Sequence, residues 1–161
     1  AHTIIVHGLA KAYSMTGWRI GFMAAPLPIA KAIGAIQSHS TSNPTSFAQS
    51  GAVEALDGPQ DHLDEWLGHF SQRRSFACEK LNAIKGVSCV NSEGAFYLFP
   101  NISGTGMKSV EFCERLLAEV KVAAVPGIAF GSDDYIRISY ATSMENLQQA
   151  LKRVESFVDS L

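Results

Sequence analysis

The first residues that could carry out chemistry are a lysine and an arginine that lie close together in the chain. Lys11 and Arg19 belong to the segment 8–21, which begins and ends with glycine and contains no acidic residue. A lysine forms a Schiff base with an aldehyde when part of its population is uncharged, as desolvation or a neighbouring cation can bring about. An arginine donates two parallel hydrogen bonds to a phosphate. The pair therefore suits pyridoxal phosphate, although spacing alone leaves open a solvated loop lysine and a surface arginine.

Both residues fall between two runs that are typical of strands. Residues 3–6 are β-branched and are followed by His7 and Gly8, and residues 18–23 predict a second strand that stops before Pro26. Unbroken apolar runs favour strands that are covered on both faces, as in α/β sheets. Ligands of such sheets bind at the carboxyl ends of the strands. The sequence therefore predicts an α/β fold in which the lysine follows the first strand.

The string from Ala10 to Gly21, AKAYSMTGWRIG, closely resembles a segment of one enzyme family. It is similar to the cofactor-lysine segment of the class I and II aminotransferases, the aspartate aminotransferase-like group of fold type I pyridoxal-phosphate enzymes. The resemblance implies that Lys11 binds the cofactor covalently and that Arg19 binds its phosphate. Many members carry serine or threonine three residues before the lysine. Here that residue is Gly8, so any phosphate contact at this position must come from the backbone.

The composition is that of an ordinary globular chain. It has 161 residues, of which 47% are hydrophobic and 17% charged, with a net charge of −2. These values predict neither nucleic acid nor a membrane as a partner. Cys78, Cys89 and Cys113 are odd in number and lack C-x-x-C spacing, so we expect reduced thiols in a cytoplasmic protein and no metal site. The chain opens on Ala1 and a strand rather than on methionine, which suggests the carboxyl-terminal part of a longer protein.

Hydrophobic periodicity predicts the remaining elements. Helices are expected over residues 27–36, 46–56, 60–84, 109–119 and 142–161, and strands over residues 86–90, 95–99, 122–125 and 135–140. The resemblance then implies two domains. Residues 1–60 would form the carboxyl-terminal part of the large cofactor-binding domain, and residues 61–161 the small carboxyl-terminal domain. The expected fold is the carboxyl-terminal portion of fold type I: the end of the large-domain sheet plus an α+β small domain.

A second arginine lies in the middle of a predicted strand. Alternation places Tyr135, Arg137 and Ser139 on one face. An arginine at such a position is seldom fully buried without an anion, and its planar fork suits a carboxylate. An edge-strand arginine in water fits the pattern equally well. The string IRISYA from Ile136 to Ala141 resembles the closing motif of the family. That resemblance implies that Arg137 binds the α-carboxylate of the substrate.

Three further segments carry weaker signals. Residues 38–46 have the composition of a surface loop, but residues 41–49 resemble the segment that reaches the partner's active site in aminotransferase homodimers. Just upstream, Gln37 stands in the region where the aspartate-specific branch has a substrate-binding arginine. Residues 95–99 resemble a family segment whose aromatic residues, here Phe96 and Tyr97, fit a pocket wall and a core position equally well. Residues 126–131 match the Pro-Gly-x-x-Phe-Gly part of the family's Val-x-Pro-Gly-x-x-Phe-Gly motif near the entrance of the active site.

The resemblance implies a pyridoxal-phosphate-dependent aminotransferase that moves an amino group between an amino acid and a 2-oxo acid. In that reaction Lys11 would also serve as general base. Two alternatives share the same residues: another fold type I enzyme such as a lyase or synthase, and a non-catalytic effector domain of a transcription regulator. The family's remaining cofactor contacts come from residues before position 1. We therefore expect the isolated chain to be inactive and to bind the cofactor weakly or not at all.

Overall fold

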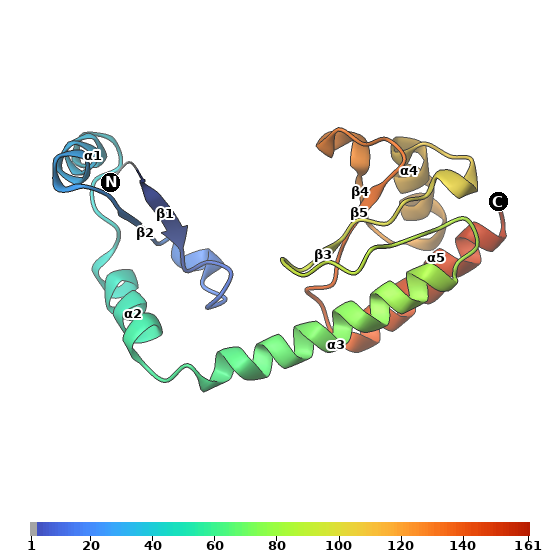
Figure 1. Ribbon diagram of the computed structural model, residues 1–161, viewed down its shortest axis with the longest axis horizontal. Coiled ribbons are helices and arrows are strands. Elements are labelled where there is room, and N and C mark those ends of the chain that lie inside the picture. Colours follow the sequence, from blue (N-terminus) through green and yellow to red (C-terminus); the bar gives the residue numbers. More distant parts are fainter. Residues whose placement is uncertain (1–2) are drawn as a thin grey trace. The chain divides into compact units, whose positions relative to one another are not determined.

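The computed structural model describes residues 3–161, which divide into two compact units. The first unit is Ala1–Glu65 and the second is Trp66–Leu161, with the helix α3 (Asp61–Ala83) carrying the boundary between them (Figure 1). No helix in the described part of the chain is long and apolar enough to cross a lipid bilayer. The two units are described separately below.

The first unit is built on a pair of antiparallel strands. β1 (Ile5–Gly8) pairs with β2 (Gly21–Ala24), and Ile5 lies opposite Ala24 (Figure 1). A second strand was expected from residue 18, but residues Thr16–Trp18 form a 3₁₀ helix, η1, instead. Arg19 then adopts a left-handed backbone conformation, with a φ of 54°. Extended pairing cannot pass through such a residue, so the second strand begins only at Gly21.

Two helices complete the first unit. α1 (Leu27–Ser40) has a proline in its first turn, as predicted, and α2 is Ser46–Asp57. α1 extends four residues beyond the predicted end at residue 36. Its last turn is closed by the hydrogen bond from the Thr41 backbone N–H to the Gln37 carbonyl at 3.1 Å. The loop between the two helices is therefore shorter than its polar composition indicated.

The first unit leaves much of its apolar surface in contact with solvent. All of β1 is exposed, and β2 is exposed except at the half-buried Met23. The expectation that these strands are covered on both faces is therefore not met within the described residues. Large apolar side chains are also exposed on both helices of the unit: Leu27, Ile29, Ile36, Phe47, Val53 and Leu56. An uncovered sheet and amphipathic helices indicate surfaces that other protein segments bury.

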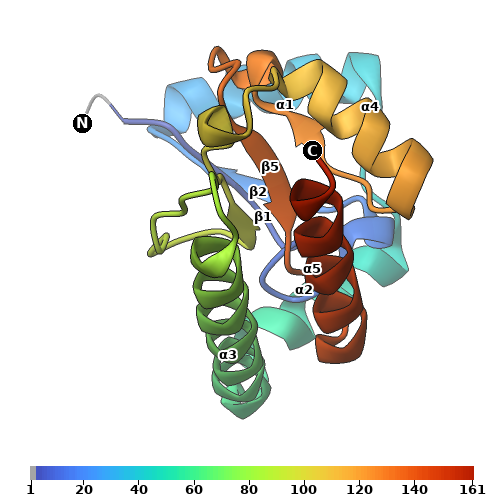
Figure 2. The same cartoon turned by 90° about the vertical axis from the view of Figure 1, so that its right-hand side faces the viewer.

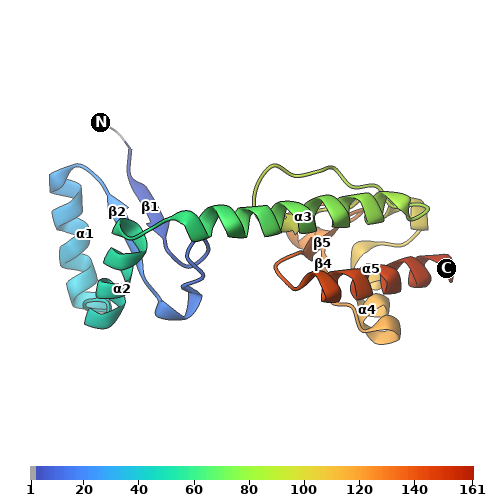
Figure 3. The same cartoon turned by 90° about the horizontal axis from the view of Figure 1, so that it is seen from below.

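The second unit combines a small sheet with three helices. Its sheet has the strand order β3-β5-β4, with both pairings antiparallel. Figure 2 shows α3, α4 and α5 around β5, and α3 and α5 lie side by side in Figures 1 and 3. The elements that follow α3 are β3 (Tyr97–Leu98), η2 (Ser103–Thr105), α4 (Ser109–Val120), β4 (Val125–Pro126), η3 (Gly127–Phe130), β5 (Ile136–Ser139) and α5 (Met144–Asp159). The predicted strand over residues 86–90 is reduced to one bridge, between Ser88 and Asn101.

The core of the second unit lies on one face of β5. Ile136, Ile138 and Tyr140 are almost completely buried there, as their alternation predicts. The helices cover them with an apolar stripe each: Ala77, Cys78 and Leu81 from α3, Phe112, Cys113 and Leu116 from α4, and Leu147, Leu151, Val154, Phe157 and Val158 from α5. The Ser143 hydroxyl caps α5 by accepting a hydrogen bond from the Asn146 N–H at 3.1 Å. The opposite face of β5, which carries Arg137, remains open.

Candidate active site

Lys11 lies in the connection between β1 and β2, in a turn that directly follows the end of β1. The turn is closed by two backbone hydrogen bonds, from Tyr13 N to the Leu9 carbonyl and from Ser14 N to the Lys11 carbonyl, each 3.3 Å long. The lysine side chain is exposed. Lys11 and Arg19 therefore belong to one loop, which is closed at its base by the paired strands.

The same loop holds Arg19 in an unusual backbone conformation. Arg19 and Ser14 both have a φ of 54°, in the left-handed region that favours glycine. Each such residue costs about 1–2 kcal/mol, a cost that is often retained where function requires a particular geometry. The Arg19 Nη1 donates to the Thr16 carbonyl at 3.1 Å, and no acidic residue among residues 3–161 pairs with it. Most of its N–H donors therefore remain available to an external anion.

Apolar side chains fix this loop to the rest of the first unit. Leu9 and Met15 are buried although the residues around them are exposed. The Trp18 ring packs edge-on against Phe47 of α2, with 6.1 Å between centroids. A Cβ added to Gly51 of α2 would lie 2.6 Å from the same indole ring. The ring therefore packs against α2 at a position where glycine leaves room for it. The residue next to Arg19 is thus held against α2.

Arg137 belongs to the second unit, at the centre of the open face of β5. Its side chain is half-buried, and β4 places Val125 directly opposite it. The Arg137 Cζ lies 4.3 Å from the centroid of the Tyr97 ring and 4.7 Å from that of Phe130. Within residues 3–161 its guanidinium has no ion pair and no hydrogen bond. Arg137 therefore presents unpaired donors, as a carboxylate-binding arginine requires.

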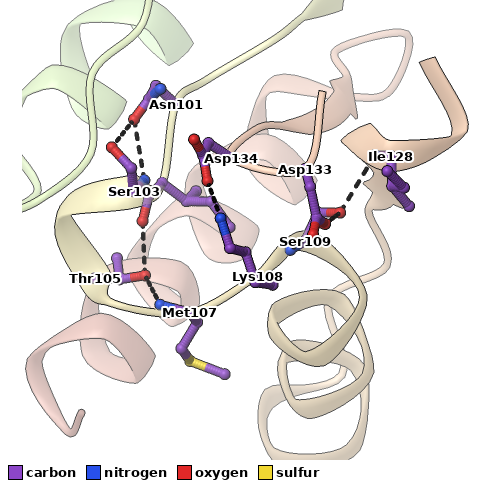
Figure 4. Close-up of polar contacts among 10 residues, drawn as sticks. Asn101, Ser103, Thr105, Met107, Lys108, Ser109, Ile128, Asp133 and Asp134 are labelled. Carbon is purple, nitrogen blue, oxygen red and sulfur yellow. Dashed lines mark hydrogen bonds and ion pairs between the residues drawn. The ribbon is translucent and has the colours of Figure 1, made fainter. Parts of the chain in front are cut away.

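A polar network ties the loop that carries Phe130 to the segment leading into β5 (Figure 4). Ser109, fully buried at the start of α4, donates its hydroxyl to the Asp133 carboxylate at 2.6 Å and accepts the Ile128 N–H at 3.3 Å. Gly127 donates its N–H to the Tyr135 carbonyl at 2.8 Å. A Cβ on Gly127 would lie 2.2 Å from that carbonyl oxygen, so only glycine fits.

Sequence reasoning named Arg137 as a candidate but missed the aromatic residues that contact its guanidinium. Tyr97 appeared as a pocket-wall or core residue, and Phe130 only as part of a matching motif. The register pairs Tyr97 with Ser139, which places its side chain on the same face as Arg137 and diagonal to it. This register could not be read from the sequence, because the contacting segments are far apart along the chain. The sequence did contain a hint, because two family motifs with aromatic residues precede the strand that carries Arg137.

Comparison with known proteins gives one consistent result. The family described as Aminotransferase class I and II matches residues 1–154. The aspartate aminotransferase of Bacillus subtilis is 49% identical over 98% of this chain, and the aspartate/prephenate aminotransferase of Nitrosomonas europaea is 43% identical over 98%. The solved aspartate aminotransferase of Rhizobium meliloti superimposes with a TM-score of 0.93 at 44% identity, covering 98% of this chain and 42% of that one.

The fold is thus that of the pyridoxal-phosphate-dependent transferases of fold type I. The chain belongs to the class I and II aminotransferases. It spans about 41% of the length of the Bacillus subtilis relative and 43% of the Nitrosomonas europaea one, as their carboxyl-terminal part. The expected family and fold class are confirmed.

The loop between β1 and β2 has the donor set that the family's cofactor, pyridoxal phosphate, requires. Lys11 offers an amine that can condense with the aldehyde, and Arg19 offers donors for the phosphate. Thr16 donates its hydroxyl to the Ala10 carbonyl at 3.0 Å, which joins the two ends of the segment between the lysine and the arginine. The residues present therefore fit the cofactor.

Proposed function

We propose that this chain is the carboxyl-terminal part of a pyridoxal-phosphate-dependent aminotransferase that moves an amino group between an amino acid and a 2-oxo acid. The observation that carries the proposal is the loop with an exposed lysine and an arginine free of acidic partners, within a chain whose curated relatives are aminotransferases. In this proposal Lys11 binds the cofactor, Arg19 holds its phosphate and Arg137 binds the substrate α-carboxylate. Residues 1–60 belong to the cofactor domain and residues 61–161 to the small domain.

Each residue has a separate task in the reaction. When bound, the cofactor withdraws the electron pair of the bond that breaks at the substrate α-carbon. Lys11 Nζ would hold the cofactor and would serve as the base that removes the α-proton and later returns a proton. Arg137 fixes the carboxylate, so the bond to the α-hydrogen keeps one orientation. Arg19 neutralises the phosphate and keeps it in place.

The covalent role of Lys11 can be tested directly. The complete protein that contains this chain is mixed with pyridoxal phosphate, reduced with borohydride, digested and mapped by mass spectrometry. We expect the cofactor mass on the peptide that contains Lys11 and its loss in Lys11→Ala. Lys31→Ala, which removes an exposed lysine of α1, is the matched control and should label normally. Labelling of another lysine would refute the assignment of Lys11.

The relatives suggest aspartate as the first amino donor to assay. Those in Bacillus subtilis and Nitrosomonas europaea are described as aspartate and aspartate/prephenate aminotransferases. Gln37 occupies the region where the aspartate-specific branch carries an arginine, so any contact with the distal carboxylate comes from elsewhere. A screen of amino donors against 2-oxoglutarate, with prephenate as a second acceptor, ranks the candidates. Turnover of aromatic donors but not aspartate would exclude an aspartate-directed enzyme.

We further infer a cytoplasmic homodimer. The three cysteines are buried free thiols, as suits a reducing compartment. The loop 41–45 between α1 and α2, expected to face a partner subunit, is exposed, and Gln49 steadies it by donating to the Pro44 carbonyl at 2.8 Å. Light scattering of the complete protein tests the dimer. A monomer that keeps full activity would exclude this loop from a partner's active site.

A further inference from the structure

We propose that Tyr97 and Phe130 are positioning residues that hold the guanidinium of Arg137 ready for the substrate carboxylate. The inference rests on the proposed function and deepens it, because it names what orders the carboxylate-binding arginine. Both rings contact the guanidinium, at 4.3 Å and 4.7 Å from Cζ. They come from separate segments, β3 and η3, so they restrain it from two parts of the fold.

Ring contacts suit this task because they leave the N–H donors of the guanidinium unused. A cation above an aromatic face is attracted by the π electrons of the ring and spends none of its N–H donors. An aspartate or glutamate beside Arg137 would order it equally well, but would compete with the substrate for the same donors. In the described residues no acidic group pairs with Arg137. The rings therefore order the side chain and keep its hydrogen-bonding capacity for a ligand.

The rings are themselves supported. Phe130 packs edge-on against Phe99, with 5.9 Å between centroids, and Phe99 stacks on Tyr135 at 5.0 Å with an interplanar angle of 10°. On the other side, Phe96 lies 4.5 Å from the Tyr97 ring. Phe130 also belongs to the same 3₁₀ helix as Ile128, whose backbone N–H donates to Ser109 in the Ser109–Asp133 network (Figure 4). Each of the two rings that contact Arg137 is thus itself in contact with a further aromatic ring.

Ordering an arginine in advance strengthens ligand binding. A free arginine side chain samples many rotamers, and a carboxylate that immobilises it must offset that loss. Removing either ring should therefore weaken carboxylate binding, while the cofactor-dependent steps proceed as before. A cation–π contact at a partly exposed site corresponds to about a two- to fivefold change in affinity.

The test compares ring-removing and ring-preserving variants of the complete protein. Tyr97→Leu and Phe130→Leu should each raise KM for the amino donor about two- to fivefold, with kcat within about twofold of wild type. Tyr97→Phe keeps the ring and should retain the wild-type KM. Ile128→Ala, which trims an exposed neighbour in the same 3₁₀ helix, is the control for local disturbance and should change neither constant.

A second readout does not depend on turnover. The dissociation constant of maleate, a dicarboxylate, is measured by calorimetry for the same variants and should rise by the same factor as KM. Unchanged KM and maleate affinity in both leucine variants would overturn the inference, as would equal losses in Tyr97→Phe and Tyr97→Leu. A wild-type protein that binds no maleate would also overturn it. A protein without aminotransferase activity whose leucine variants bind maleate more weakly would refute the proposed function alone.

Discussion

The two arginines of interest are held in different ways. Arg19 has a left-handed backbone conformation, and its side chain donates from Nη1 to the Thr16 carbonyl. Arg137 sits in a regular strand and is fixed through its side chain, by two aromatic rings. Both arrangements leave N–H donors unpaired within the described residues. At the scale of single residues, each arginine therefore keeps hydrogen-bond donors for the anionic group that we propose it binds.

Replacing Arg137 by lysine tests how much the planar guanidinium contributes to kcat/KM. Lysine keeps the charge but cannot donate two parallel hydrogen bonds to one carboxylate. We expect Arg137→Lys to lower kcat/KM for amino acids by about 10- to 100-fold, as for the loss of one charged hydrogen bond. Arg153→Lys is the matched control, since Arg153 is an exposed arginine of α5 that donates only to the Val120 carbonyl at 3.5 Å. Equal activity of the two variants would argue against a carboxylate at Arg137.

Gly127→Ala should destabilise the second unit. The added methyl group would lie 2.2 Å from the Tyr135 carbonyl oxygen and 2.3 Å from that of Ser132, both backbone atoms that cannot rotate away. We expect a loss of about 1–3 kcal/mol, measured by urea unfolding. Gly68→Ala has open space within α3 and should instead stabilise slightly, since alanine favours helix. The same sign for both changes would contradict this reasoning.

Buried cysteines give the second unit a pH dependence. Burial raises the pKa of the Cys113 thiol from 9.0 to about 11, and burial, followed by the neighbouring Cys78, raises that of Cys89 to about 12. The unfolded chain releases these protons first. The stabilising contribution is therefore complete below pH 9 and is lost as the pH rises toward about 11. Cys113→Val should flatten the fall in unfolding free energy between pH 9 and pH 11. An unchanged slope would mean that Cys113 ionises as readily when folded.

At the scale of elements, neighbouring aspartates at one turn have different roles. Asp133 accepts from the fully buried Ser109, whereas Asp134 pairs with Lys108 at 2.7 Å on the surface, where both side chains are about half or more exposed (Figure 4). The first contact joins α4 to the turn before β5. The second is an exposed ion pair, a kind that contributes little to stability.

We therefore expect Ser109→Ala to lower the free energy of unfolding, and Asp134→Ala to leave it almost unchanged. Removing the hydroxyl leaves the Ile128 N–H without a partner, and it leaves Asp133 Oδ1 with only the Ser109 backbone N–H at 3.2 Å, a loss of about 1–3 kcal/mol. Asp134→Ala should leave the urea midpoint almost unchanged. The comparison is decisive because both changes affect the same turn. Similar losses would show that the burial of Ser109 does not set its contribution.

The helices were predicted well, while the strands and the loop of the first unit were not. α4 and α5 carry regular apolar stripes, and the capping serine of α5 precedes its helix, so local sequence defines them. β3 and β4 have two residues each, too few for a period to appear. The turn at Thr16–Trp18 follows from the packing of Trp18 on α2, which sequence periodicity does not encode. Arg137 was a candidate from the sequence. The contact of its guanidinium with aromatic rings could not be predicted, because it depends on strand register.

At the scale of the whole molecule, the units differ in how far they bury their apolar residues. The second unit has a continuous core, whereas the first exposes Val6 by 78% and both Ile36 and Phe47 by 69%. A free surface of this kind is unfavourable in water and promotes association. The chain spans only part of the length of its relatives. Segments elsewhere in a complete subunit can therefore cover this apolar surface.

Limited proteolysis of the 161-residue chain should reveal this difference. We expect cleavage first within the first unit, and a resistant fragment that contains the second unit, residues 66–161, because exposed and loosely packed segments open most readily. Mass spectrometry of the fragments over time identifies the cut sites. A hydrophobic dye should bind the intact chain and lose most of its signal once the first unit is digested. Simultaneous loss of both units would contradict separate stability.

The connection between β1 and β2 has a mechanical consequence. Because the two strands pair from Ile5–Ala24 to Gly8–Gly21, both ends of the loop are clamped together. Lys11 and Arg19, proposed to hold opposite ends of one cofactor, are therefore carried by the same hairpin. If that hairpin moved, the proposed covalent attachment at Lys11 and the proposed phosphate contact at Arg19 would move together. The distance between the two attachment points of the cofactor would then stay the same.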